Sequence, residues 1–181
     1  PSPPPEVIGY RADDVETLLA GGRVALGLDP GVVRAGETWV GRWALTLAQL
    51  AARTIARGAS AILVVPDHRD ARQLDAALTS VLPAERIVRF DSAQPDADRY
   101  RGMLRAMGDD PVVVVGNRSA VYAPAARLGL IAIWNDGDPL LSEPLTPYVH
   151  ARDAALVRQE QQRSALVIAG HTRTTEVQRL V

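Results

Sequence analysis

The sequence predicts an α/β fold in which a mostly parallel β-sheet lies between two layers of helices, and two observations lead to this class. Six short runs of β-branched or aliphatic residues occur along the chain with little polar alternation, which is typical of strands buried on both faces. Amphipathic stretches with helical periodicity separate these runs. This alternation of strands and helices favours a parallel sheet covered on both sides.

The expected strands are each four to seven residues long and lie at positions 24–28, 61–65, 87–90, 112–115, 128–134 and 165–169. In a sheet of this kind, ligands bind beyond the carboxyl ends of the strands. The residues that directly follow each run are therefore the candidates for a functional site.

Helical patterns fill the intervals between the expected strands. Residues 39–57 are rich in Ala and Leu and stop at a glycine, and residues 70–82 place four apolar side chains on one stripe. Residues 96–107 begin with acidic residues and end before a glycine, while 150–162 and the final 174–181 continue the alternation. Residues 1–10, with four prolines, are expected to be a linker. Residues 11–181 are expected to form one domain, a fragment of a longer protein.

The composition excludes several kinds of chemistry. The chain has 181 residues, 47% hydrophobic and 23% charged, which suits one globular domain. It contains no cysteine, so disulfides, thiol nucleophiles and cysteine-ligated metals are ruled out. All 20 basic residues are arginine, so no lysine Schiff base or P-loop lysine can exist. No signal peptide or membrane span is recognisable, and we expect a cytoplasmic protein with no membrane partner.

A glycine pair resembles a phosphate-binding loop without its essential residues. Gly36 and Gly41 have the spacing of such a loop, after an expected strand and before an expected helix. A working loop continues with Lys and then Ser or Thr, which reach the phosphates and Mg²⁺. Here Arg42 and Trp43 follow instead. The spacing alone is a weak signal, and we favour an ordinary strand-to-helix turn.

The fifth expected strand runs into an acidic turn. In nucleotide hydrolases this turn supplies a carboxylate to the metal and a Glu that orients water. Here Trp134 and Asn135 occupy those positions, followed by Asp136, Gly137 and Asp138. The two aspartates could bind a cation, but Asp-Gly-Asp-Pro is also a good turn sequence, which is the reading we favour.

Four segments occur in a recognisable order. Residues 61–67 end in Val-Pro-Asp, residues 116–124 read Gly-Asn-Arg-Ser-Ala-Val-Tyr-Ala-Pro, residues 128–133 are apolar, and residues 150–153 read His-Ala-Arg-Asp. In order and spacing they resemble the PriA family of bacterial replication-restart helicases. Its first motor domain has a strand ending Val-Pro-Glu, a Gly-Thr-Arg-Ser segment, an apolar strand ending Asp-Glu-Glu-His, and then Tyr-His-Ala-Arg-Asp. The likeness covers roughly residues 37–181.

The resemblance implies a three-layer αβα, RecA-like (P-loop NTPase-like) domain, the first motor domain of a replication-restart protein. It implies forked or single-stranded DNA and other primosome and replication proteins as partners. The family binds zinc through cysteines that lie outside this fragment, so we expect no metal or other cofactor in this chain.

The departures from the family fall on the motor motifs. Its phosphate-loop Lys-Thr corresponds to Trp43-Ala44, or to Arg42-Trp43 if the glycines are matched, and Asp-Glu-Glu-His corresponds to residues 134–137. This loss resembles the actinobacterial, degenerate type of the family. We therefore expect Gly36, Gly41, Arg42, Trp43, Ala44, Trp134, Asn135 and Asp136 to mark a degenerate nucleotide site that does not bind ATP.

In the family, the Gly-Thr-Arg-Ser and Val-Pro-Glu segments lie near single-stranded DNA. The resemblance therefore implies that Arg118 and Ser119 bind DNA, and that Arg69 is a weaker candidate. The alternative is that Arg118 pairs with a local carboxylate and Ser119 caps a short helix. Trp39, Trp43 and Trp134 are expected to pack into the empty nucleotide site rather than stack on bases.

The function predicted from the sequence is a DNA-binding, helicase-like domain without catalysis of its own, acting in primosome assembly and the restart of stalled replication forks. One alternative is an active ATP-dependent 3′–5′ DNA helicase that uses substituted residues. Another is an unrelated small-molecule enzyme on a doubly wound sheet.

Overall fold

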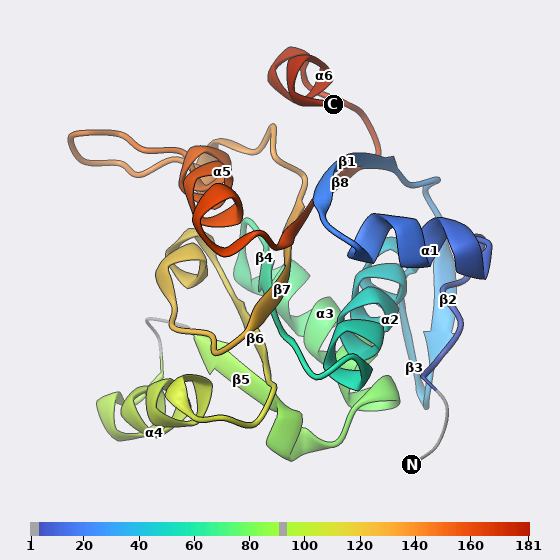
Figure 1. Ribbon diagram of the computed structural model, residues 1–181, viewed down its shortest axis with the longest axis horizontal. Coiled ribbons are helices and arrows are strands. Elements are labelled where there is room, and N and C mark those ends of the chain that lie inside the picture. Colours follow the sequence, from blue (N-terminus) through green and yellow to red (C-terminus); the bar gives the residue numbers. More distant parts are fainter. Residues whose placement is uncertain (1–3, 91–93) are drawn as a thin grey trace.

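A computed structural model describes residues 4–90 and 94–181, and its centre is a six-stranded parallel sheet (Figure 1). The strands lie in the order β1 (Gly22–Gly27), β8 (Ala165–Gly170), β7 (Leu128–Trp134), β4 (Ser60–Val64), β6 (Val113–Gly116) and β5 (Ile87–Phe90). All neighbouring pairs are parallel. The six strands expected from the apolar runs are confirmed, with ends that differ by at most two residues.

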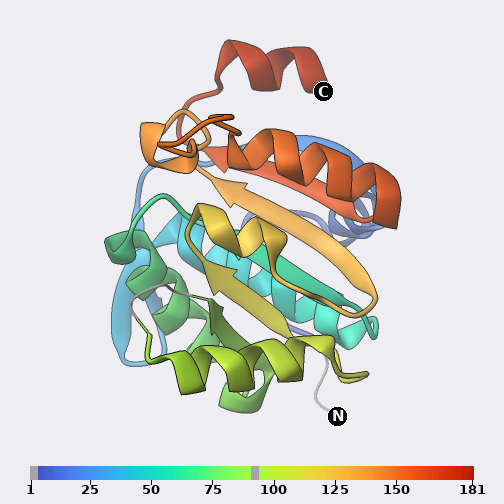
Figure 2. The ribbon, with the colours of Figure 1, turned by 90° about the vertical axis from the view of Figure 1, so that its left-hand side faces the viewer.

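Helices cover both faces of the sheet, which confirms the expected three-layer αβα class. One face carries α1 (Ala12–Leu19), α2 (Arg42–Ala56) and α3 (His68–Val81), and the other carries α4 (Asp96–Met107), α5 (Ala151–Gln162) and α6 (Thr175–Leu180) (Figures 1 and 2). Successive residues of β4 alternate between the two layers: Leu63 belongs to the first apolar core, and Ile62 and Val64 belong to the second. Both faces of the strand are therefore buried, as its continuous apolar sequence predicts.

Side chains at the carboxyl edge of the sheet cap the N-termini of the helices that follow the strands. Asp67 accepts hydrogen bonds from the backbone N–H groups of Arg69 and Asp70 and so caps α3. His150 Nδ1 accepts from the N–H of Arg152 and caps α5. Thr174 caps α6 through the N–H of Val177.

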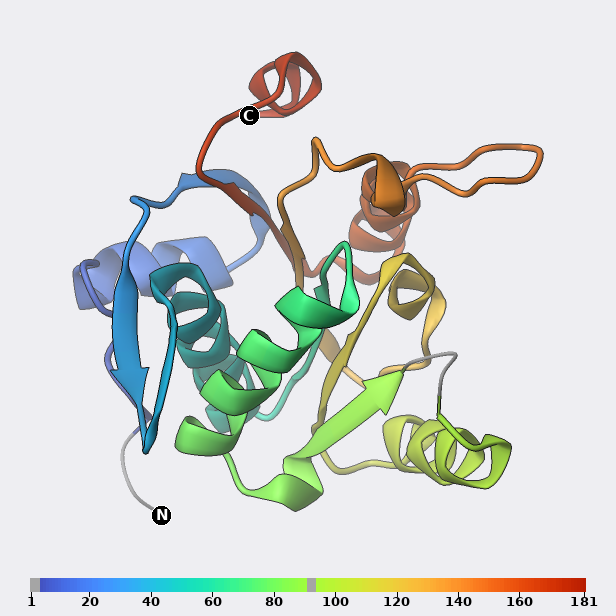
Figure 3. The ribbon, with the colours of Figure 1, turned by 180° about the vertical axis from the view of Figure 1, so that it is seen from behind.

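Residues 32–41 form a β-hairpin that the sequence analysis did not predict. β2 (Val32–Ala35) and β3 (Thr38–Gly41) pair antiparallel across a turn at Gly36, which has a φ of 58° (Figure 3). The expected strand-to-helix turn at residues 36–41 is therefore wrong, and the helix expected from residue 39 begins at Arg42. β-branched and aromatic residues on both sides of a turn glycine favour a hairpin, and this local preference outweighs helical periodicity.

The segment before α1 contacts the core. Of residues 1–10, which we expected to be a linker, residues 1–3 lie outside the described part. Val7 is buried, and Arg53 Nε donates a hydrogen bond to the carbonyl of Pro5. The backbone N–H of Ile8 donates to Gln49 Oε1 at 3.0 Å. Helix α1, which the analysis also did not predict, follows and buries Val15 and Leu19.

Candidate functional site

The candidate residues gather at the carboxyl edge of the sheet, because parallel strands end on the same side. α2 begins there after the hairpin, the turn after β7 contains Asn135 and Asp136, and the loop after β8 contains His171. Arg69 follows β4, and Arg118 and Ser119 follow the neighbouring strand β6.

Two indole rings fill the space between the end of β7 and the start of α2. The rings of Trp43 and Trp134 are stacked with centroids 4.4 Å apart and planes 7° from parallel. His171 meets Trp134 edge-on at 4.9 Å and 87°, and its Nδ1 donates to the carbonyl of Leu28 at 2.7 Å. Trp43 and Trp134 are only 5% and 4% exposed, which confirms that both are packed. We call Trp43, Trp134 and His171 the aromatic stack.

The aromatic stack covers the start of helix α2. A Cβ atom built on Gly41, the residue that precedes α2, would lie 2.5 Å from Trp43 Nε1. The indole therefore lies against the helix N-terminus, where a phosphate-binding helix presents free N–H groups to its anion. The N–H of Gly41 donates to Gln73 Oε1 at 2.7 Å, and that of Arg42 donates to the carbonyl of Gly31 at 2.8 Å. Protein atoms thus accept the hydrogen bonds of two N–H groups at the start of this helix.

The other glycine of the expected loop lies elsewhere. Gly36 occupies the far end of the hairpin, and a Cβ atom there would lie 3.7 Å from Ser80 near the end of α3. Trp39 is 68% exposed in β3, so the expectation that it packs into the nucleotide site is wrong. It faces solvent because side chains alternate along a strand, and its neighbour Val40 takes the inward position.

The carboxylate of Asp136 is held inside the protein. Its Oδ2 accepts hydrogen bonds from Arg152 at 2.9 Å and from the hydroxyl of Thr174 at 2.8 Å. Both Asp136 and Arg152 are largely buried, with side chains 5% and 12% exposed. Asp138 caps the short turn after it by accepting from the N–H of Leu140. Asp138 therefore stabilises the turn, whereas Asp136 joins the turn to Arg152 and Thr174. Among residues 4–90 and 94–181, no group of three His, Asp or Glu side chains is arranged to hold a metal ion.

His150 links this turn to α5 in its neutral form. Its Nδ1 accepts from the N–H of Arg152, and its Nε2 donates to the carbonyl of Asp136 at 3.0 Å. Burial, with a contribution from the positive charge of Arg152, lowers the pKa of His150 below its ordinary value. The His-Ala-Arg-Asp segment was a sequence signal for this region, but pattern alone did not reveal its pairing with Asp136.

The expected DNA-binding residues after β6 have partners within the chain. Arg118 Nε donates to Glu143 Oε1 at 3.0 Å, so Arg118 does pair with a local carboxylate. Ser119 does not cap the short helix. Asn117 caps it, and the hydroxyl of Ser119 donates to Asn117 Oδ1 at 2.9 Å. Arg69 lies exposed in the first turn of α3.

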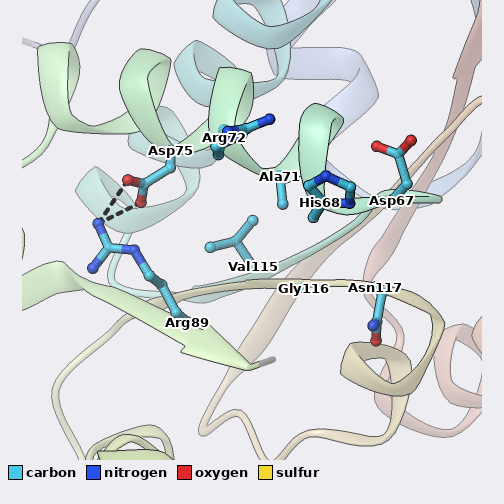
Figure 4. Close-up of a pocket in the computed structure, with 9 residues that line it drawn as sticks. All are labelled: Asp67, His68, Ala71, Arg72, Asp75, Arg89, Val115, Gly116 and Asn117. Atoms are coloured by element: carbon cyan, nitrogen blue, oxygen red, sulfur yellow. Dashed lines mark hydrogen bonds and ion pairs between the residues drawn. The ribbon is translucent and has the colours of Figure 1, made fainter. Parts of the chain in front are cut away.

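A cavity of about 320 Å³ lies between α3 and the ends of β5 and β6 (Figure 4). It is lined by Asp67, His68, Ala71, Arg72, Asp75, Arg89, Val115, Gly116 and Asn117. Arg89 crosses one end to Asp75 with a shortest distance of 2.6 Å, and Asn117 lies at the other end. This ion pair was not predictable from the sequence, since an arginine within a short apolar strand gives no sign of its partner.

Asp70, in the first turn of α3, has an altered pKa. Burial, followed by repulsion from Asp67 and Asp138, raises the pKa of Asp70 to about 6. The effect of Asp138 reflects the sheet order, since β4 and β7 are neighbours and their following turns lie side by side.

Comparison with known proteins gives consistent relatives. No protein-family model matches the chain. A "Probable replication restart protein PriA" of Mycobacterium leprae is 38% identical over 176 residues, covering 97% of this chain and 26% of the relative. The Mycobacterium tuberculosis H37Rv protein of the same description is 39% identical over 146 residues, which covers 81% of this chain and 22% of the relative. The "Replication restart protein PriA" of Treponema pallidum is 30% identical over 153 residues, which covers 81% of this chain and 21% of the relative. The chain thus spans about a quarter of the length of these relatives.

Among solved structures, the crystal structure of T4 UvsW matches with a TM-score of 0.52 at 12% identity, over 93% of this chain and 31% of that one. At this identity the match concerns the fold alone, and it supports the RecA-like architecture. Within the described residues, every helix is too short or too polar to cross a membrane.

Proposed function

We propose, from the premise that this chain is PriA-like over nearly its whole length, that it is a DNA-binding, RecA-like domain of a replication-restart protein that neither binds nor hydrolyses ATP. Its work is to hold forked or single-stranded DNA and to present a surface to other replication proteins. The aromatic stack is the observation that carries this proposal.

Loss of nucleotide binding follows from what the nucleotide position contains. A phosphate loop needs free N–H groups, a lysine and a hydroxyl for Mg²⁺, and an acidic turn needs a free carboxylate. Here an indole covers the start of α2, the chain has no lysine, and the carboxylate of Asp136 is bound by Arg152 and Thr174. Neutralisation of triphosphate charge and coordination of the metal are lost together.

DNA binding is proposed for the carboxyl edge, through Arg118, Ser119 and Arg69. The chain carries a net charge of −1, so long-range attraction to DNA is small and local groups must supply the contacts. The Arg118–Glu143 pair is partly exposed, with side chains 31% and 35% accessible, so a phosphate can compete for the guanidinium. We expect weak, salt-dependent binding.

Fluorescence anisotropy of a labelled fork tests the DNA-binding part, and repeating it with excess Mg²⁺-ATP at constant ionic strength tests whether a nucleotide affects DNA affinity. The expected result is DNA binding that ATP does not change, since a nucleotide that does not bind cannot shift DNA affinity. Arg118→Ala should weaken binding equally for all sequences and lower the salt slope by about one unit. An ATP-dependent affinity favours the active helicase, and no binding at low salt removes the DNA-binding role.

A further inference from the structure

The outer face of the β2–β3 hairpin exposes a tryptophan beside an arginine. Trp39 lies directly opposite Arg34 in the antiparallel register, and both side chains are exposed. Directly paired residues on one face of such a ribbon have Cβ atoms about 5 Å apart. Val32 lies on the same face toward the base of the hairpin and is also exposed.

The opposite face of the hairpin holds it in place. Ala35 and Val40 are buried in the core formed with α2 and α3. At the base of the hairpin, the N–H of Gly41 donates to Gln73 of α3. Trp39 is therefore presented on a supported surface, which lowers the entropic cost of ordering the indole on binding.

We propose that Trp39 is a stacking platform for an unpaired base of single-stranded DNA, and that Arg34 contacts the adjacent phosphate. This rests on the DNA-binding function proposed above and assigns a base contact to Trp39, which the sequence analysis had placed in the empty nucleotide site. Tryptophan offers a large flat π-surface, and base–aromatic stacking tolerates any sequence because every base has a π-face.

The size of the face favours a base over a protein partner. Four-residue strands are about 13 Å long and two paired strands lie about 5 Å apart. A stable protein interface buries roughly 800 Å² on each side, several times what this hairpin face offers. A single indole with one flanking apolar side chain is instead matched in size to one base.

The charges around Trp39 suit a phosphate backbone. Arg34 is paired with Glu37 at 3.3 Å, but both side chains are strongly exposed, so this pair is weak and a phosphate can replace the carboxylate. Arg42 at the base of the hairpin is a second exposed arginine.

The hairpin also adjoins the edge proposed for DNA. Gln73, which binds the hairpin base, lies one helical turn from Arg69 on the same face of α3. A strand held at Arg69 therefore passes close to the base of the hairpin.

The test is a thermodynamic cycle that combines the substitution Trp39→Ala in the protein with removal of the bases from the DNA. Anisotropy would measure the affinity of the wild-type chain and of Trp39→Ala for a short oligothymidine and for an abasic oligonucleotide of equal length. Trp39→Phe is the matched control, since it keeps an aromatic ring. Thermal unfolding of each variant checks that the fold is intact, which is expected because the side chain is exposed.

The expected result is a loss of about 5- to 150-fold for Trp39→Ala on oligothymidine, partial retention by Trp39→Phe, and no difference on the abasic strand. Equal affinity of wild type and Trp39→Ala for oligothymidine overturns the stacking role while leaving the proposed DNA-binding function in place. An equal loss on both oligonucleotides also overturns it. If the wild type binds neither strand, the DNA-binding function itself fails. If Trp39→Ala abolishes self-association in sedimentation but not DNA binding, the face belongs to a protein contact.

Discussion

Replacing Trp134 by alanine tests whether the aromatic stack is part of the folded core. The ring is 4% exposed, stacks on Trp43 at 4.4 Å and meets the edge of His171. Truncating a buried tryptophan costs about 3–5 kcal/mol, because apolar burial is lost and a cavity remains. For a domain of this size, that loss corresponds to a fall in Tm of roughly 6–20 °C.

The stacking itself is measured by a double-mutant cycle. Trp43→Ala should cost a similar amount, and the double variant should lose about 0.5–1.5 kcal/mol less than the sum, because a ring pair contributes beyond its buried area. Urea unfolding followed by far-ultraviolet circular dichroism suits the measurement, since the substitutions remove the two buried tryptophans and leave only the exposed Trp39 as a fluorescent indole. A loss below about 1 kcal/mol for either single variant, or strict additivity, would refute the stacked, buried arrangement.

Three further predictions concern charged groups. Asp136→Ala should lower the free energy of unfolding in urea by about 3 kcal/mol, because it leaves the buried Arg152 without its main partner. This value is near the low end of the usual range because Asp153 still lies 3.6 Å from Arg152. An unchanged midpoint of unfolding would contradict this. Because the pKa of His150 is lowered on folding, the free energy of unfolding should decline as pH falls below about 6.5. His150→Asn can still cap the helix and should remove that part of the decline. Identical pH profiles of wild type and variant would contradict this role of His150. Because the pKa of Asp70 is raised to about 6, stability is lost as pH rises from about 4 to 6. Asp70→Asn should therefore be as stable as wild type near pH 4 and more stable at pH 7. A variant that is less stable than wild type at pH 7 would contradict this prediction.

The parallel sheet was predictable because its central strands are buried on both faces and read as continuous apolar runs. The β2–β3 hairpin was not, because its two short strands share one sequence stretch with a glycine pair whose spacing suggested a different loop. The same stretch shows why Trp39 was misplaced: whether a side chain points inward depends on strand register, and a shift of one residue reverses it.

The candidate site was predictable only in outline. The substitutions at Trp43 and Trp134 marked one region of the chain, and the structure brings these two residues together. Long-range partners carry no local signature, so the binding of Asp136 by Arg152 and of Arg118 by Glu143 could not be read from spacing. Asp136 and Arg152 are 16 positions apart in the sequence, and Arg118 and Glu143 are 25 positions apart.

Calorimetric titration of the chain with Mg²⁺-ATP tests the central claim most directly, because the account holds that an indole pair now fills the nucleotide position. The predicted result is no saturable heat of binding up to millimolar nucleotide, with DNA present or absent. Far-ultraviolet circular dichroism on the same sample would confirm that the protein is folded. A saturable isotherm with micromolar affinity would contradict the account, since it would require a phosphate site at a helix start that Trp43 covers.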